Sequence, residues 1–295
     1  MTTVGDWVAG ARPKTLPAAI VPVAVGTAAA VDRSDGGWDG TIVWWRVVAA
    51  LIVSLALQIA TNYANDYSDG IRGTDYDRAG PMRLVGSGAA PAAHVKWMAV
   101  AWFGVAAVAG LGLAIAVGWE LLAVGVAAIA AGWFYTGGKT PYGYRGLGEV
   151  FVFVFFGLVA TVGSAYVQPA GWSGRAWLAA AAVGALATAL LVTNNLRDIP
   201  TDAEAGKRTL AVRLGDGRTR LLFGALLVMP FGLAGALAFD RPWALLALGA
   251  MPVAALALRP VRVGAMGREL IPVLEATGRT QLCYGVLLTV GLWVG

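Results

Sequence analysis

Two acidic segments of the sequence share one arrangement of side chains, an asparagine followed by two aspartates at intervals of about one helical turn. They comprise Asn62, Asp66 and Asp69 in the first segment, and Asn194, Asp198 and Asp202 in the second. Residues three or four positions apart lie on the same face of a helix. We therefore expect each trio to form one acidic face, and the two segments to be an internal repeat.

Carboxylates gathered in this way need a cation. Like charges repel strongly where little water is present, and Mg²⁺ takes a few carboxylates while leaving positions for water and phosphate oxygens. Solvated loop acids or helix caps would not be expected to occur twice with the same asparagine and nearly the same spacing. The sequence therefore predicts a site for Mg²⁺ as cofactor, shared between the two segments.

Basic, glycine-rich stretches accompany both acidic segments. The bases that stand out are Arg83, Lys139, Arg145, Lys207 and Arg208. Guanidinium and ammonium groups bind phosphate oxygens well, although any one of these bases could instead be a charge that sets membrane topology. Metal-binding acids beside phosphate-binding bases together indicate a diphosphate ligand.

The elements that must position these groups are apolar. Of the 295 residues, 58% are hydrophobic and only 13% are charged, whereas soluble domains carry about 25% charge. This composition excludes a water-soluble enzyme, a disordered protein and a nucleic-acid binder, and it predicts a polytopic membrane protein. The single cysteine, Cys283, excludes an intrachain disulfide and a cysteine-ligated metal site.

Long apolar runs define the expected bundle. The candidate spans are residues 16–31, 43–65, 97–118, 120–136, 148–168, 176–196, 221–239, 243–258 and 281–295. We therefore expect an all-α fold, a polytopic membrane bundle of about nine transmembrane helices around a central cavity. It would form a single domain over 1–295, with two aspartate-motif halves of roughly 1–136 and 137–295.

The distribution of Lys and Arg predicts the orientation of the bundle. If the N-terminus is cytoplasmic, 18 of the 22 basic residues fall on the cytoplasmic side. The exceptions are Arg33, Arg46, Arg175 and Arg241. Both acidic segments then close a span at the cytoplasmic face, so a diphosphate bound there would have apolar helices beneath it. A prenyl diphosphate fits that arrangement.

The paired motifs resemble the two aspartate-rich motifs of the UbiA superfamily of intramembrane prenyltransferases, and the resemblance covers nearly the whole chain. Segments 11–17, 77–83 and 135–149 make the sequence most similar to the branch that prenylates 1,4-dihydroxy-2-naphthoate in menaquinone biosynthesis. The resemblance implies nine transmembrane helices in a bacterial cytoplasmic membrane. It also implies two substrates, a polyprenyl diphosphate and 1,4-dihydroxy-2-naphthoate, and release of carbon dioxide when they join.

The resemblance implies roles for individual residues in an electrophilic aromatic substitution. Mg²⁺ would be bound by Asp66, Asp69, Asp198 and Asp202, with Asn62 and Asn194 as further ligands or as groups that orient the acids. Contacts to the diphosphate would come from Arg83, Lys139, Lys207 and Arg208. Whether Asp75 reaches the metal stays open, because other branches place a third acid closer to the first two.

Two further sets of residues would act on the organic parts of the substrates. The ring faces of Tyr63, Tyr67 and Tyr135 are candidates for stabilising an allylic carbocation. The acceptor's carboxylate would be held by Arg12, Lys14 or Arg145, among which the sequence does not choose.

Other functions remain as alternatives. Another UbiA-type enzyme could use a different acceptor, such as 4-hydroxybenzoate, homogentisate or haem. Intramembrane acids also occur in transporters, but the acids here lie at the ends of spans rather than within them. A phosphatidyl-transferring enzyme is disfavoured because its single compact motif is not found.

Overall fold

The computed structural model describes residues 2–31, 42–73 and 83–295, and those residues form helices and loops with no strand. The helices are α1 (Val4–Gly10), α2 (Pro17–Ala29), α3 (Trp44–Arg72), α4 (Ala92–Ala116), α5 (Glu120–Phe134), α6 (Gly148–Val152), α7 (Ala160–Tyr166), α8 (Gly174–Arg197), α9 (Ile199–Glu204), α10 (Leu210–Leu237), α11 (Met251–Arg262) and α12 (Leu270–Val294). A π-helix, η3 (Phe153–Val159), joins α6 to α7, and a 3₁₀ segment, η4 (Pro242–Ala250), precedes α11. Short 3₁₀ turns are η1 (Pro13–Thr15), η2 (Gly143–Arg145) and η5 (Gly267–Glu269). The expectation of an all-α fold is confirmed for the described part of the chain.

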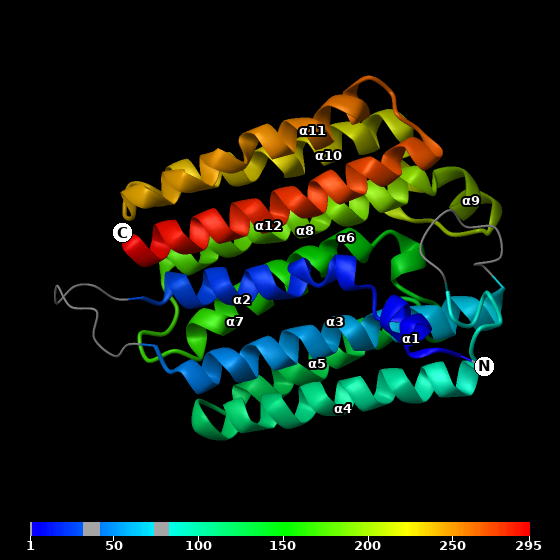
Figure 1. Cartoon of the computed structure of the whole chain (residues 1–295), viewed down its shortest axis with the longest axis horizontal. Helices are drawn as coiled ribbons and strands as arrows, with labels where there is room; N and C mark the ends of the chain where they lie inside the picture. Colours follow the sequence, from blue (N-terminus) through cyan, green and yellow to red (C-terminus); the bar gives the residue numbers. More distant parts are fainter. Residues whose placement is uncertain (1, 32–41, 74–82) are drawn as a thin grey trace.

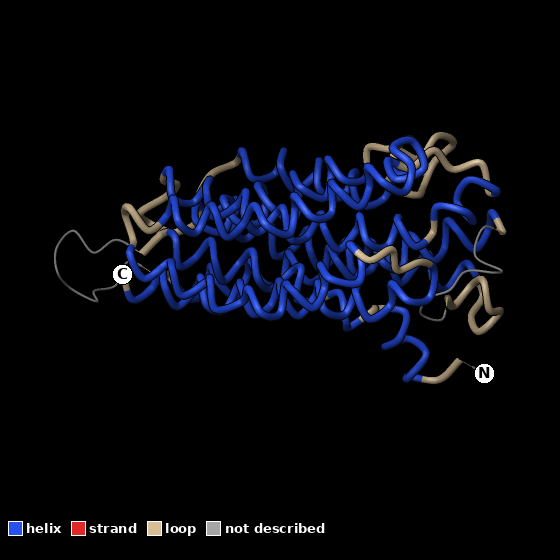
Figure 2. Tube along the Cα trace, turned by 90° about the horizontal axis from the view of Figure 1, so that it is seen from above, coloured by secondary structure: helices blue, strands red, loops and turns tan. Residues whose placement is uncertain are grey.

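The long helices run side by side in one elongated bundle (Figures 1 and 2). The N-terminus, α9 and the carboxyl end of α3 lie at one end of the bundle, and the C-terminus lies at the other (Figure 1). Within the described residues, six helical segments are long and apolar enough to cross a membrane, and α2 and α5 are shorter apolar helices. All nine expected apolar runs fall on helices. The nine-span topology and the cytoplasmic N-terminus stay predictions.

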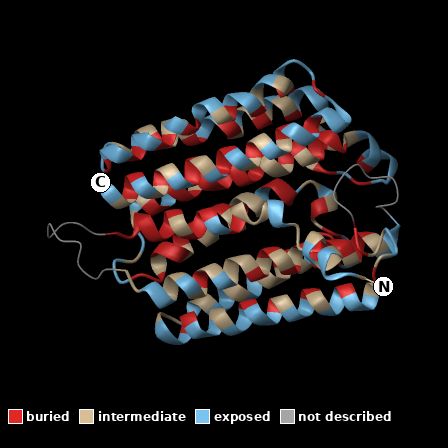
Figure 3. Cartoon of the chain, in the orientation of Figure 1, coloured by how far each residue is buried: buried red, intermediate tan, exposed pale blue. Residues whose placement is uncertain are grey.

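Buried residues lie mostly in the middle of the bundle, and the outer helices carry many exposed residues (Figure 3). Helix α8 is the most enclosed of the six long segments. It lies against η3, where a Cβ on Gly157 would stand only 2.5 Å from the Cα of Gly184. Small residues let helices approach closely in a bilayer, where no hydrophobic force drives them together. These two glycines therefore fix how near the π-helix comes to α8.

Three of the four arginines that the charge distribution assigns to the non-cytoplasmic side donate hydrogen bonds to backbone carbonyls at helix ends. Arg175 donates from Nε to the carbonyl oxygen of Ala29 at 2.8 Å, and Arg241 donates from Nη2 to that of Val31 at 3.0 Å. Arg46 donates from Nη1 to the carbonyl of Val167 at 2.9 Å. The last carbonyls of a helix lack partners within the helix and attract cations. These charges therefore cap helices at the end of the bundle opposite the acidic segments, and Arg33 lies outside the described residues.

Candidate functional site

A cavity of about 1330 Å³ runs between the helices. Its walls are mostly apolar and come from α2, α3, α4, α5, η3, α7, α8 and α12. Polar and charged side chains also line it, among them Arg12, Lys14, Asn62, Asn65, Asp69, Arg83, Asn194, Asn195, Arg197, Asp202 and Lys207. The cavity thus has an apolar chamber and a charged part, here called the charged mouth, which is lined by these polar and charged residues from both acidic segments and their neighbours.

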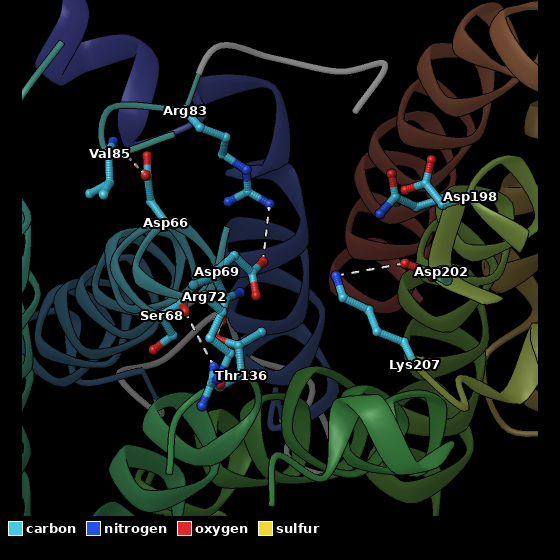
Figure 4. Close-up of polar contacts among 12 residues, drawn as sticks. Asp66, Ser68, Asp69, Arg72, Arg83, Val85, Thr136, Asp198, Asp202 and Lys207 are labelled. Atoms are coloured by element: carbon cyan, nitrogen blue, oxygen red, sulfur yellow. Dashed lines mark hydrogen bonds and ion pairs between the residues drawn. The ribbon is translucent and has the colours of Figure 1, made fainter. Parts of the chain in front are cut away.

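The first acidic segment lies on one unbroken helix, as expected, because α3 continues to Arg72. Asp69 lines the cavity and accepts a hydrogen bond from the hydroxyl of Tyr144. Its other carboxylate oxygen stands 3.7 Å from Nη2 of Arg83 (Figure 4). The amide of Asn62 also lines the cavity, and its Nδ2 donates to the carbonyl of Ala11 at 3.0 Å. This helix therefore presents Asp69 and Asn62 to the cavity together.

Asp66 has a different environment from Asp69. Its carboxylate accepts hydrogen bonds from the backbone N–H groups of Leu84 and Val85 at 2.8 and 3.0 Å, and the residue is 2% exposed. It does not belong to the cavity lining. Because Arg83 immediately precedes these two residues, Asp66 fixes the segment that carries Arg83 to the cavity (Figure 4).

Arg72 secures the loop that follows α5. Its guanidinium donates to the carbonyl oxygens of Thr136 and Gly138, and it lies 5.7 Å from the centroid of the Tyr144 ring. In the same loop the hydroxyl of Thr136 donates to Oδ1 of Asn65 at 2.8 Å. These contacts hold the loop, and with it the Tyr144 hydroxyl, against the end of α3.

The second acidic segment does not lie on one helix, contrary to the expectation from its spacing. Helix α8 ends at Arg197, and Asp198 takes the non-helical position before α9. Pro200 has no N–H to donate to the carbonyl four residues earlier, so the helix of the preceding residues cannot continue through it. Asp198 instead accepts from the adjacent Arg197 at 2.6 and 2.8 Å, and Arg197 also donates to Oδ1 of Asn194 at 2.7 Å.

Asp202 is the acid of this segment that lines the cavity. Nζ of Lys207 stands 3.7 Å from its carboxylate, and the backbone N–H of Lys207 donates to the Asp202 carbonyl at 2.8 Å (Figure 4). The same Nζ lies 4.7 Å from the ring centroid of Tyr144. Tyr144 thus contacts groups of both halves, since its hydroxyl binds Asp69 and its ring lies against Lys207.

The structure separates the predicted bases into two groups. Arg83, Lys207, Arg12 and Lys14 line the cavity, and Lys14 also forms a 2.9 Å ion pair with Glu275 of α12. Lys139, Arg145 and Arg208 are exposed and do not belong to the cavity lining. Arg12 has a left-handed backbone with φ of 55°, which is uncommon for a residue with a side chain. Asp75 lies outside the described residues.

The predicted aromatic residues also separate. The hydroxyl of Tyr63 donates to the carbonyl of Trp7 at 2.6 Å, and Tyr67 packs against Trp133, so neither belongs to the cavity lining. Tyr135 does line the cavity, and it begins a row of aromatic rings there. The row, here called the aromatic row, consists of Tyr135, Tyr142, Phe151 and Phe155.

Rings in the aromatic row contact one another closely. The Tyr142 and Phe151 rings are stacked with centroids 4.0 Å apart, and Phe151 and Phe155 follow at 6.0 Å. Burial raises the pKa of the Tyr142 hydroxyl, so it stays protonated and donates to the carbonyl of Ala131 at 2.8 Å. The π-helix η3 carries Phe155, and such helices are frequent at functional sites.

Several cavity residues were not predicted from the sequence as site residues. They are Asn65, Thr136, Tyr142, Tyr144, Phe151, Phe155, Asn195 and Arg197. A partial signal existed for the four aromatic residues among them, because the segment from Tyr135 to Glu149 combines aromatic residues, glycines and bases, with further aromatic residues following it. No spacing rule distinguishes Asn195 from its neighbour Asn194, because which of two adjacent amides faces a cavity depends on the rotation of the helix.

Comparisons with known proteins agree with this architecture. The UbiA prenyltransferase family matches residues 19–263. Among similar proteins, the 1,4-dihydroxy-2-naphthoate octaprenyltransferase of Mycobacterium tuberculosis is 51% identical over 100% of this chain and 99% of its own length. The octaprenyltransferase of the same name from Escherichia coli is 36% identical over 98% of this chain and 95% of its own length.

Solved structures of UbiA homologues share the fold at low sequence identity. The apo structure of a UbiA homologue from Aeropyrum pernix superposes with a TM-score of 0.69 at 16% identity, covering 100% of this chain and 99% of that one. A homologue from Archaeoglobus fulgidus bound to GPP and Mg²⁺ has a TM-score of 0.62 at 12% identity, covering 96% and 99% of the two chains. With most of its length matched by the family and a relative half identical over the whole chain, this protein belongs to the UbiA prenyltransferase family.

Proposed function

We propose that this protein transfers a polyprenyl group from polyprenyl diphosphate to 1,4-dihydroxy-2-naphthoate, with loss of carbon dioxide, to give demethylmenaquinone in its reduced, hydroquinone form. The proposal rests on one observation, that both acidic segments and the residues that follow them meet at one apolar cavity, through Asp69, Arg83, Asp202 and Lys207. The names of the relatives from Mycobacterium tuberculosis and Escherichia coli support the naphthoate acceptor and the polyprenyl donor.

The charged mouth would hold the diphosphate. Asp69 and Asp202 approach from α3 and α9, and each already has a basic side chain at 3.7 Å. Such loose ion pairs leave room for a diphosphate to draw Arg83 and Lys207 toward its oxygens. The apolar chamber below would take the prenyl tail, whose burial there is favoured by the hydrophobic effect.

Mg²⁺ fits these donors. Among the described residues no group of three His, Cys, Asp or Glu side chains is close enough to hold a metal by itself. Mg²⁺ is commonly held by one or two carboxylates together with substrate phosphates and water, and the cavity offers carboxylates and amide oxygens for that purpose. Asp69, Asp202 and Asn62 are the residues that would hold it, and Asn194, Asp66 and Asp198 would join them only after leaving their present partners. When bound, Mg²⁺ supplies positive charge that stabilises the departing diphosphate.

The proposed reaction needs no nucleophilic side chain, because bonds break and form only within and between the two substrates. The bond between the allylic carbon and the diphosphate oxygen breaks, and the electron pair leaves with the diphosphate. The ring carbon that bears the acceptor's carboxylate forms a bond to the allylic carbon. Loss of that carboxylate as carbon dioxide returns its bonding pair to the ring and restores aromaticity.

The aromatic row would stabilise the carbocation formed from the donor, and the bases near α1 would bind the carboxylate of the acceptor. Ring faces stabilise a nearby cation, so Tyr135, Tyr142 and Phe151 are suited to the allylic carbocation. Of the bases considered for the acceptor's carboxylate, Arg12 and Lys14 line the cavity and Arg145 does not. This placement favours Arg12 and Lys14.

The protein's setting follows from the same proposal. A long prenyl donor and its product both partition into lipid, so the enzyme would act in the cytoplasmic membrane of a bacterium. The nine apolar segments would each cross the membrane, with the N-terminus and the charged mouth on the cytoplasmic side and the C-terminus outside.

The acceptor is tested with membranes that contain the protein, Mg²⁺ and a labelled long-chain prenyl diphosphate. We expect labelled, decarboxylated product with 1,4-dihydroxy-2-naphthoate and none above background with 4-hydroxybenzoate or homogentisate. Product with 4-hydroxybenzoate alone would instead assign the chain to another branch of the family. Membranes that carry an Asp69→Asn variant provide the control for endogenous enzymes.

Metal removal is expected to abolish turnover. Since the carboxylates cannot balance the charge of the leaving diphosphate, EDTA should reduce activity to below about one hundredth, and added Mg²⁺ should restore it. Product formation is followed by chromatography, and circular dichroism checks that EDTA leaves the helices intact. Full turnover in EDTA would contradict the proposed metal dependence.

A further inference from the structure

Glu149 is a buried carboxylate that the proposed reaction does not use. It lies in the first turn of α6 and is 5% exposed. Its Oε1 accepts a hydrogen bond from Nδ2 of Asn195 on α8 at 2.8 Å, and Asn195 is itself 7% exposed. Within the residues that the structure describes, Glu149 forms no ion pair with a Lys or Arg.

A carboxylate in this position has one property that its neutral replacements lack. Burying it is costly, although the first turn of a helix reduces that cost. An ionised carboxylate accepts hydrogen bonds and donates none. The hydrogen bond from Nδ2 of Asn195 to Oε1 of Glu149 therefore fixes the orientation of the amide, with its NH₂ end toward the carboxyl group.

The other end of the amide then has a defined direction. With Nδ2 held by Glu149, the Oδ1 atom of Asn195 is turned from Glu149, and Asn195 lines the cavity whereas Glu149 does not. Its neighbour Asn194 has its own Oδ1 engaged by Arg197 at 2.7 Å. Asn195 is thus the amide of this pair whose oxygen is available for a substrate.

The surroundings of Asn195 indicate which part of a substrate it meets. Gly148, next to Glu149, lies against the Tyr135 ring, since a Cβ there would stand 3.2 Å from Cε2 of Tyr135. Asn195 therefore lies beside the start of the aromatic row, where a flat acceptor ring would stack. An amide oxygen attracts a hydroxyl hydrogen and repels a carboxylate or phosphate oxygen.

From these contacts we infer that Glu149 is a positioning residue that orients Asn195, and that Asn195 accepts a hydrogen bond from a ring hydroxyl of the aromatic acceptor. This inference rests on the proposed function for the class of acceptor. A hydrogen bond from that hydroxyl increases electron density in the ring, which favours attack on the allylic carbon. Asn195 would thereby contribute to selecting hydroxylated acceptors.

The test compares Glu149→Gln with Asn195→Ala and the double variant in the purified full-length protein. The glutamine side chain fills the same space but can also donate, so it no longer fixes the amide. We expect each single variant to raise KM for 1,4-dihydroxy-2-naphthoate about tenfold, with KM for the prenyl diphosphate unchanged. The double variant should be no worse than Asn195→Ala alone, because residues that act as one unit are not additive.

A modified acceptor provides the second readout. The naphthoate has two monomethyl ethers, one for each hydroxyl. The ether that blocks the hydroxyl that meets Asn195 should show the same KM with wild type and Glu149→Gln. The matched control is Thr193→Val on the same helix, because the Thr193 hydroxyl donates to the Ala189 carbonyl at 2.9 Å and does not line the cavity. It should keep wild-type KM values.

The outcomes distinguish this inference from the proposed function. Wild-type KM for the acceptor in Glu149→Gln, or an increase confined to the donor or to the Mg²⁺ requirement, would overturn the orienting role. Should Glu149→Gln fail to fold, an unchanged acceptor KM in Asn195→Ala would overturn it equally. If wild-type protein makes no naphthoate product at all, the proposed function has failed, and the same variants are compared on the hydroxylated acceptor that the protein uses.

Discussion

Asp69→Asn and Asp202→Asn are each expected to lower kcat/KM by about 1,000-fold, which corresponds to about 4 kcal/mol of lost transition-state stabilisation. Each change keeps the size of the side chain and removes one negative charge at the mouth of the cavity. The two carboxylates come from α3 and α9, so their equal importance would show that both halves of the chain act on one diphosphate. Initial rates with a saturating acceptor measure the effect.

Asp216→Asn is the matched control for these two variants. Asp216 is a carboxylate with 51% of its side chain exposed, paired with Arg220 one turn away on α10 and outside the cavity lining. Such an exposed pair contributes little to stability, so activity should stay near wild type. Near-normal turnover in either Asp69→Asn or Asp202→Asn would show that the diphosphate binds elsewhere.

Lys207→Met is expected to raise KM for the prenyl diphosphate about 100-fold, equivalent to about 2.7 kcal/mol of binding. The ammonium group is buried, 3.7 Å from Asp202 and 4.7 Å from the Tyr144 ring centroid. Its loss removes a partner for the diphosphate and leaves Asp202 buried beside an apolar side chain. Titration of the donor at fixed acceptor measures KM, and thermal unfolding in detergent shows how far the fold is affected.

Two further variants test whether the positive charge at position 207 accounts for the higher KM. Lys207→Arg keeps the charge and should recover most of the affinity, although its planar fork does not match the ammonium geometry. Lys96→Met removes a lysine at an exposed position of α4 over the Tyr67 ring, away from the cavity, and should leave KM unchanged. An unchanged donor KM in Lys207→Met would exclude Lys207 from diphosphate binding.

Much of the fold could be predicted because one physical requirement dominates it. In a bilayer each backbone polar group must be satisfied within its own helix, so an apolar run such as 176–196 had to become a helix, and it lies within α8. The end of α8 was less predictable. Pro200 breaks the helix there, and the prediction that Asn194, Asp198 and Asp202 lie on one helix was wrong for that reason.

The candidate site was predictable at the level of segments but less so at the level of side chains. Asp66 and Asp69 have the same type, lie one turn apart and share a helix, yet one caps a backbone segment and the other lines the cavity. A helix places residues around its axis, but only its neighbours determine which of them face a cavity. Tyr144 shows the same limit, because its contacts to Asp69 and Lys207 join segments far apart in the sequence.

By itself the sequence determined that this protein is an all-helical membrane protein, since its apolar content and scarce charge permit little else, and that acids of two segments are its distinctive chemistry. The tertiary structure decided which groups meet. It brings Asp69, Asp202, Arg83 and Lys207 to one cavity, turns Asp66 toward the backbone of Leu84 and Val85, and pairs Glu149 with Asn195. The physical reason is that local composition sets the periodicity of each helix, whereas packing between helices sets its rotation, and rotation decides which side chain reaches the substrate.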